Sequence, residues 1–218
     1  MRLLTDPHPG GSERLLILLP GAEIALEDFA RQGFIAAVRE RGYAFDIQCA
    51  ALDYTHVMAR TVESTLHTEV IQPAQTAGYR QIWLAGISLG AFNSLLYASQ
   101  HAAELAGLCL LSPYPGTGDI LGEIRSAGGP QSWLETPEAQ QGDERVFWRW
   151  LAECQRSDHW PCPIHAITGT EDRFIRGQRL LMDTLPATCR TELPGAHDWP
   201  AWQAQWAHWL DHGPWSRA

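Results

Sequence analysis

The chain has 218 residues, of which 45% are hydrophobic and 19% charged, a composition typical of a globular protein rather than a disordered one. Its formal net charge of −9, from 16 basic and 25 acidic residues, argues against a surface that binds nucleic acid or anionic membranes. No apolar run approaches the ~20 residues that a membrane-spanning helix needs. At this length we expect a single domain, residues 1–218.

The N-terminal region and the cysteines favour a cytoplasmic protein. The apolar run Leu15–Leu19 is too short for a signal peptide and ends in Pro20-Gly21, so we interpret it as a buried strand. The chain has five cysteines, an odd number, and they lie far apart in the sequence. This is typical of reduced thiols in a cytosolic compartment.

Apolar runs alternate with helix-like stretches along most of the chain. This alternation predicts an α/β fold with a doubly wound, mostly parallel sheet of about six strands and helices on both faces. Most of the runs are continuously apolar, as expected for strands that are covered on both faces. The predicted strands are Leu15–Leu19, Phe45–Ala51, Gln81–Ile87, Gly107–Leu111, Ile164–Thr168 and Arg190–Leu193.

Helices are predicted between these strands. Pro73 is expected to kink or end the second of them. In the last helix Trp199, Trp202, Trp206 and Trp209 recur at spacings of three and four residues, which predicts one packed face. The predicted helices are Leu26–Arg41, Val57–Ala77, Leu89–Leu105, Phe174–Leu185 and Trp199–His212.

One stretch, residues 114–163, breaks the alternation. It contains several glycines and then an amphipathic segment near Glu144–Gln155. Such an excursion is either a small lid over one edge of the sheet or an ordinary crossover helix preceded by a flexible loop. The two interpretations carry equal weight.

Ser88 lies between Gly86 and Gly90, where the predicted strand Gln81–Ile87 passes into a helix. A sharp strand-to-helix turn holds such a serine in a strained conformation with its hydroxyl presented, and neighbouring backbone then leaves room only for glycine two positions away on each side. The alternative is a serine that merely caps the helix. We predict that Ser88 is a nucleophile.

A serine hydroxyl needs a base to take its proton. His197 follows the last predicted strand in a loop, so we expect it at the same carboxyl edge of the sheet as Ser88. The pair His208 and His212 could bind a metal, but the sequence offers no third and fourth ligand, so we predict no metal.

The imidazole in turn needs a carboxylate to orient it. Asp172 and Glu171 both follow the strand Ile164–Thr168. We predict that Asp172 orients the imidazole, and Glu171 is the alternative. Asp198 adjoins the histidine and is expected to cap the last helix.

The order Ser88, Asp172, His197 and the G-x-S-x-G turn resemble the α/β-hydrolase superfamily over most of the chain, from Leu15 to about Leu210. The resemblance implies a minimal, six-stranded version of that fold. It also implies an oxyanion hole made by the backbone N–H groups of Ala22 and Leu89. Pro20 stands where many relatives have histidine. The segment Gly21–Phe29 resembles the small carboxylesterase and acyl-thioesterase branch.

These features predict a serine hydrolase that cleaves an acyl ester or thioester of a small molecule through an acyl-enzyme, with no cofactor. Amide or lactone hydrolysis and acyl transfer use the same machinery and stay open. The alternative from another class is a non-catalytic binding protein that keeps the fold.

Overall fold

The computed structural model describes residues 1–142 and 145–214. Within these residues seven strands form one sheet in the order β1-β3-β2-β4-β5-β6-β7, and among them only β1 runs antiparallel to its neighbour. The predicted α/β fold with a mostly parallel sheet is therefore confirmed. The strands are β1 Leu3–Asp6, β2 Arg14–Leu19, β3 Asp46–Ala50, β4 Gln81–Ile87, β5 Gly107–Leu111, β6 Ile164–Gly169 and β7 Arg190–Leu193.

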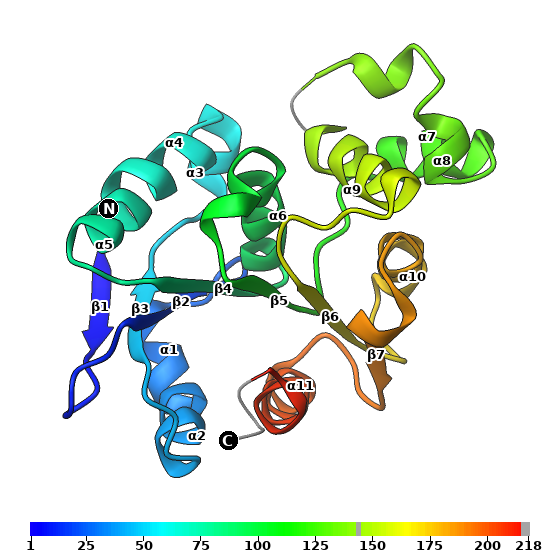
Figure 1. Cartoon of the computed structure of the whole chain (residues 1–218). Coiled ribbons are helices and arrows are strands. Elements are labelled where there is room, and N and C mark those ends of the chain that lie inside the picture. The colour runs from blue at the N-terminus through cyan, green and yellow to red at the C-terminus, as the bar shows by residue number, and fades with distance from the viewer. Residues whose placement is uncertain (143–144, 215–218) are drawn as a thin grey trace.

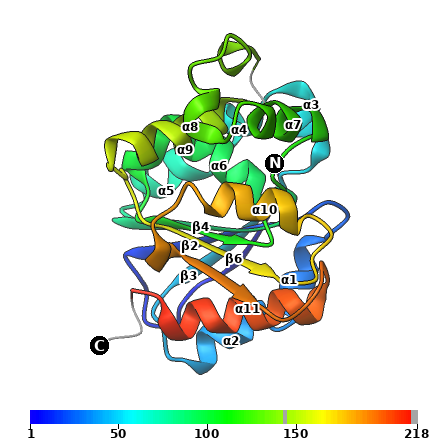
Figure 2. The same ribbon diagram turned by 90° about the vertical axis from the view of Figure 1, so that its right-hand side faces the viewer.

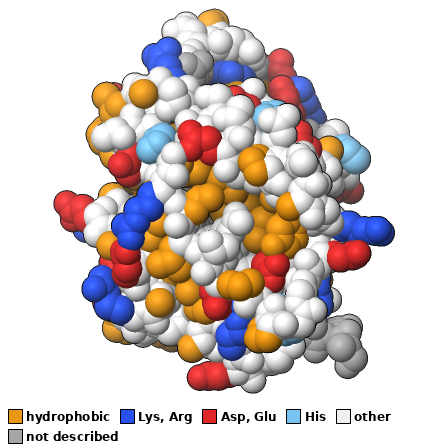
Figure 3. Space-filling model, turned by 90° about the vertical axis from the view of Figure 1, so that its left-hand side faces the viewer, with side chains coloured by type: hydrophobic (Ala, Val, Ile, Leu, Met, Phe, Trp, Pro, Cys, Tyr) orange, Lys and Arg blue, Asp and Glu red, His pale blue; other side chains and the backbone are white. Residues whose placement is uncertain are grey.

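The strand that the sequence analysis missed is β1, which makes the sheet one strand larger than predicted. It pairs antiparallel with β3, so that Leu3 faces Ala50, and it forms the edge of the sheet. Its side chains are half-buried or exposed, and Leu3 is 40% exposed. Because β1 has only four residues and no buried face, the sequence contains no apolar run from which this strand could be predicted. Figure 3 shows the side of the molecule at which β1 lies, with hydrophobic side chains gathered near its centre.

Helices cover both faces of the sheet (Figures 1 and 2). One face is covered by α1 Leu26–Arg31, α2 Phe34–Glu40 and α11 Trp199–His212. The other is covered by α3 Tyr54–Ala59, α4 Val62–Leu66, the π-helical turn η1 His67–Ile71, α5 Gln72–Thr76, α6 Leu89–His101, η2 Ala102–Glu104, α7 Gly118–Ser126, α8 Pro130–Trp133, η3 Glu138–Gln140, α9 Val146–Ser157 and α10 Ile175–Met182. The short turn η5 Ala187–Cys189 precedes β7.

Two predicted helices are broken in the structure. The first divides into α1 and α2 at Gly33, whose φ of 78° is one that glycine adopts without strain. The second divides into α3, α4, η1 and α5. Pro73 lies in the first turn of α5, directly after the π-helical turn. In a regular α-helix its ring would clash with the carbonyl of residue 69, and the wider π turn relieves that clash.

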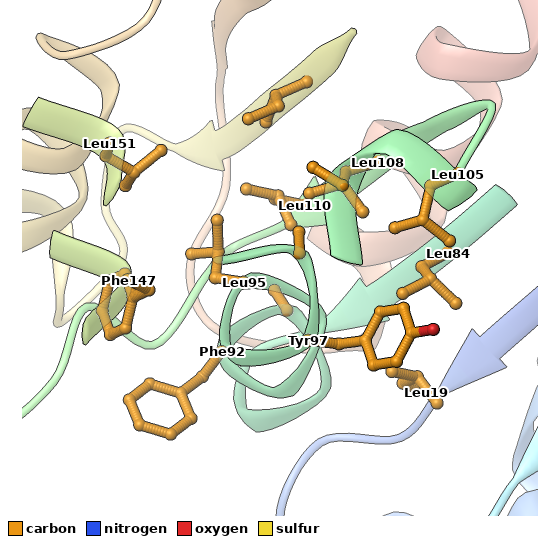
Figure 4. Close-up of a cluster of buried hydrophobic side chains, with 14 of the residues drawn as sticks. Leu19, Leu84, Phe92, Leu95, Tyr97, Leu105, Leu108, Leu110, Phe147 and Leu151 are labelled. Atoms are coloured by element: carbon orange, nitrogen blue, oxygen red, sulfur yellow. The ribbon is translucent and has the colours of Figure 1, made fainter. Parts of the chain in front are cut away.

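The excursion 114–163 packs onto the α6 side of the sheet. Phe147, Trp148 and Leu151 of α9 are fully buried and belong to the same core as the strand residues Leu84 and Leu108. Figure 4 shows Phe147 and Leu151 beside the side chains of α6. The predicted amphipathic segment is therefore α9, although Glu144 lies outside the described residues.

Trp202, Trp206 and Trp209 of α11 are buried against the opposite face of the sheet, and Trp199 is partly buried beside them. This confirms the predicted packed face. Among the helices of the described residues, none combines the length and the apolar character that crossing a membrane requires.

Candidate active site

Ser88 occupies the turn between β4 and α6 with a strained backbone. Its φ of 52° and ψ of −109° lie where a residue with a β-carbon is disfavoured. Its side chain makes no capping hydrogen bond to α6. The hydroxyl is therefore not used as a helix cap, which was the alternative interpretation of this serine.

Gly86 and Gly90 are required by close backbone contacts. A β-carbon on Gly86 would lie 2.2 Å from the carbonyl carbon of Gly90, and one on Gly90 would lie 2.0 Å from the carbonyl oxygen of Leu19. A side chain at position 86 would force strand β4 and helix α6 apart, and one at position 90 would push α6 away from the end of strand β2. The tight packing around the turn thus explains the spacing of the two glycines about Ser88.

His197 and Asp172 reach Ser88 from two other strand ends. The Nε2 atom of His197 lies 2.9 Å from Ser88 Oγ, and its Nδ1 atom lies 2.7 Å from Asp172 Oδ2. With the ring proton on Nδ1, the ring donates to the carboxylate and Nε2 accepts from the serine hydroxyl. The structure thus brings the three predicted residues into one hydrogen-bonded chain.

The loops that carry Asp172 and His197 are packed directly against each other. The Glu171 N–H donates to the carbonyl of Gly195 at 2.9 Å, and the Thr170 N–H donates to the carbonyl of Leu193 at 2.8 Å. A β-carbon on Gly169 would lie 2.2 Å from the Gly195 oxygen, so only glycine allows this approach. The distance between Asp172 and His197 is therefore set by backbone contacts.

Asp172, the carboxylate that is hydrogen-bonded to His197, is well shielded from water. Asp172 is 1% exposed. Burial raises the pKa of its carboxyl, but hydrogen bonds from His197 and from the Phe174 N–H outweigh burial and hold that pKa below its ordinary value. Asp172 is thus ionised at neutral pH and can balance a positive charge on His197.

Glu171 and Asp198, the other carboxylates close to this site in sequence, have different surroundings. Glu171 is exposed to solvent, although it adjoins Asp172 in sequence. Asp198 accepts a hydrogen bond from the Ala201 N–H at 3.2 Å and caps α11, which confirms its predicted role.

Two aromatic residues that the sequence analysis did not assign to the site hold the His197 ring. Phe174 and Trp202 contact it edge-on, with ring centroids at 5.1 and 5.2 Å. Phe174 follows Asp172 by two residues, a spacing that could have suggested its position. Trp202 was recognised only as part of a packed helix face.

The predicted oxyanion residues adjoin Ser88. A β-carbon on Gly21 would lie 3.4 Å from Ser88 Cβ, which puts the backbone before Ala22 next to the serine. Leu89 is the first residue of α6, where backbone N–H groups have no partner within the helix. Both backbone segments therefore lie beside Ser88.

A cavity of about 280 Å³ lies between α3, α4, α6 and α9. Its apolar wall includes Val57, Met58, Phe92 and Leu96, and Arg60, Glu63 and Arg149 also line it. The ring of Phe92 contacts Tyr114, and Tyr114 contacts Phe174 beside His197. A row of aromatic rings thus connects this cavity with the Ser88 site.

No family model matches the sequence, and no curated protein matches it. Solved structures do resemble it. An S-formylglutathione hydrolase from Staphylococcus aureus has a TM-score of 0.63 and 15% identity over 90% of this chain and 79% of that one. A monoacylglycerol lipase from Paleococcus ferrophilus has a TM-score of 0.56 and 15% identity, covering 96% of this chain and 98% of that one. A thioesterase domain from the curacin biosynthetic pathway has a TM-score of 0.56 and 11% identity, covering 95% of this chain and 94% of that one. At these identities the likeness is one of fold.

Proposed function

We propose that this chain, which has the α/β-hydrolase fold, is a serine hydrolase that cleaves an acyl ester or thioester of a small molecule. The observation that carries the proposal is the hydrogen-bonded chain from Ser88 Oγ through His197 to Asp172, with distances of 2.9 and 2.7 Å. The strained backbone of Ser88 supports it, because such strain is typical of residues that a protein holds ready for a reaction.

In the proposed reaction Ser88 Oγ attacks the acyl carbonyl carbon while its proton passes to His197 Nε2. Asp172 holds the imidazole with Nε2 facing the hydroxyl and balances the imidazolium that forms. His197 then gives the proton to the departing alcohol or thiol, which leaves an acyl group on Ser88. A water molecule, deprotonated by the same imidazole, attacks the acyl-enzyme and releases the acid.

The oxyanion that forms at each attack needs hydrogen-bond donors. We assign this role to the N–H groups of Ala22 and Leu89, because the backbone before Ala22 lies against Ser88 and Leu89 begins α6. The N-terminus of α6 adds the positive end of a helix dipole beside the developing charge. No cofactor is needed for these steps.

The proposal is tested by comparing wild type with Ser88→Ala on p-nitrophenyl acetate and butyrate. We expect kcat to fall on the order of 10⁴–10⁶-fold, because the variant loses the nucleophile. A fluorophosphonate probe should label wild type at Ser88 and leave the variant unlabelled.

The matched control is Ser99→Ala. Ser99 lies on the same helix, and its hydroxyl donates only to the carbonyl of Leu96. This variant should keep the hydrolysis rate of wild type. Equal rates in wild type and Ser88→Ala would remove Ser88 from the mechanism. Absence of labelling in folded wild type would favour a binding protein that has the fold without the chemistry.

A further inference from the structure

A second cluster of reactive side chains lies at the end of α6 that is far from Ser88. The ligand atoms of His67, His101 and Glu104 all lie within 4.8 Å of one another. His67 begins η1, His101 ends α6 and Glu104 belongs to η2. At 1.5 Å per residue the length of α6 separates this cluster from Ser88 by ~20 Å.

The Glu104 carboxylate faces both imidazole rings. Its Oε1 atom lies 3.0 Å from His101 Nδ1, and its Oε2 atom lies 3.7 Å from His67 Nδ1. Bonds of about 2.0–2.2 Å around a tetrahedral zinc ion separate neighbouring ligand atoms by about 3.3 Å. The two rings are stacked with centroids 4.7 Å apart, so their Nδ1 atoms reach the same carboxylate. The contact of Glu104 with His101 is thus slightly shorter than this spacing and its contact with His67 slightly longer. No two of the three ligand atoms are more than 4.8 Å apart, so side-chain rotations bring them to one ion.

The contacts of His101 require more than a neutral imidazole provides. Its Nε2 atom lies 2.6 Å from Glu63 Oε1, while its Nδ1 atom lies 3.0 Å from Glu104 Oε1. A neutral imidazole has one N–H and can serve only one of these carboxylates. The other contact needs a positive charge, supplied either by a second ring proton or by a metal ion.

We propose that His67, His101 and Glu104 bind a divalent transition-metal ion, with zinc the best match to two imidazoles and one carboxylate. Glu63 then accepts the Nε2–H of His101, as carboxylates commonly do behind a metal-bound histidine. The two carboxylates supply two negative charges for the ion. Water completes the coordination.

The neighbourhood fits a metal site that solvent can reach. The three side chains are 21–31% exposed, so an ion can enter without unfolding. The Tyr97 hydroxyl lies 3.1 Å from His67 Nδ1 and 3.0 Å from Glu104 Oε2, and must give up one of these contacts when the ion binds. An ion here would tie η1 to the end of α6. The proposal departs from the predicted absence of a metal, which considered only His208 and His212, and it is independent of the chemistry at Ser88.

The test uses the full chain after treatment with a chelator. Zinc is titrated calorimetrically, and Co²⁺ is titrated while its visible absorption is recorded. We expect one equivalent to bind. Glu63→Gln should weaken binding about 10–100-fold, because it changes only the partner behind His101. His67→Gln and Glu104→Gln, which remove direct ligands, should weaken binding further.

The matched control is the double variant His208→Gln/His212→Gln, which removes the stacked histidine pair of α11 and should bind zinc as wild type does. Circular dichroism and ester hydrolysis show whether each variant is folded, and the hydrolysis rate reports the Ser88 chemistry separately. Wild type that binds no stoichiometric zinc overturns the proposal, as does unchanged affinity in folded Glu104→Gln. His101 would then hold a second proton between its carboxylates.

Discussion

The strain at Ser88 persists because three backbone hydrogen bonds hold the turn on both sides. The Ser88 N–H donates to Leu111 at 2.9 Å, and the Ser88 carbonyl accepts from the N–H groups of Phe92 and Tyr114, each at 3.1 Å. A positive φ at a residue with a β-carbon costs free energy that such contacts must offset. At the residue scale, the position of the hydroxyl is therefore determined by the elements that surround the turn.

Asp172→Asn should reduce kcat for p-nitrophenyl acetate on the order of 10³–10⁴-fold without unfolding the protein. The amide cannot balance an imidazolium, and its NH₂ favours the wrong ring tautomer. Hydrolysis kinetics, with circular dichroism to check folding, measure this effect.

Glu171→Gln is the control for that substitution, since it removes the neighbouring carboxylate, which is exposed. We expect its kcat to stay near that of wild type. A large loss in Glu171→Gln together with an active Asp172→Asn would reverse the assignment of the acid.

At the scale of elements, α11 packs against α2 through stacked aromatic rings and polar contacts. Trp206 stacks on Phe34 with ring centroids at 5.3 Å and donates its indole N–H to the Phe34 carbonyl at 3.0 Å. At the far end of α11, Arg41 donates from Nε and Nη2 to both carboxylate oxygens of Asp211, at 2.6 and 3.1 Å. The end of α11 is thus joined to the end of α2.

This ion pair predicts a stability difference that depends on pH. The hydrogen bond from Arg41 lowers the pKa of Asp211 below its ordinary value of 3.8. A lowered folded-state pKa stabilises the protein above the unfolded-state pKa, and this contribution is lost as the pH falls through the folded-state value. Asp211→Asn should therefore lower the free energy of unfolding at pH 7 by no more than ~1 kcal/mol, since the carboxylate is half exposed.

Urea unfolding of wild type and Asp211→Asn at neutral pH, and again below the folded-state pKa of Asp211, measures this difference. Groups other than Asp211 titrate in both proteins and cancel in the comparison. A gap between the two proteins that stays constant down to the lowest pH would show that the carboxylate charge is not what stabilises the contact.

At the scale of the whole molecule, the sheet separates two cores, and the excursion 114–163 belongs to one of them. Trp148 is fully buried in that core, and its indole N–H donates to the carbonyl of Pro115 at 3.0 Å. Phe147, its neighbour on α9, contacts Phe92 of α6 edge-on with ring centroids at 5.3 Å. We therefore treat the excursion as part of the same cooperative unit as the sheet.

Trp148→Ala should lower the free energy of unfolding of the whole chain by about 3–5 kcal/mol, because it leaves a large cavity in the shared core. Urea unfolding followed by circular dichroism and by loss of hydrolysis should give one coincident transition. Trp150→Ala, at a partly buried position on the same helix, is the control and should cost less. Unchanged global unfolding in Trp148→Ala would mean that the excursion opens separately, as a lid does.

Patterns that repeat over short distances could be predicted from the sequence. The limits of β4, β5, β7 and α11 agree to the residue with those predicted. β4 and β5 are apolar runs and α11 has a periodic apolar face, whereas β7 is a short polar strand that is marked only by the Pro194-Gly195 turn after it. The edge strand β1 was missed, since its alternation of half-buried and exposed side chains is too short to recognise. The break at Gly33 was missed because the helical spacing of apolar residues continues across it.

The sequence by itself determined that Ser88, an acidic residue at 171 or 172, and His197 follow three different strands. They were therefore expected to lie close together, because the strand ends of a parallel sheet meet at one edge whatever the details of packing. Only the tertiary structure decided between Asp172 and Glu171 as partner of the imidazole. Adjacent residues after a strand point in different directions, and backbone contacts between two loops bury one carboxylate and leave the other in water. Only folding, likewise, brings His67, His101 and Glu104 together, since no local spacing connects a π-helical turn with the end of another helix.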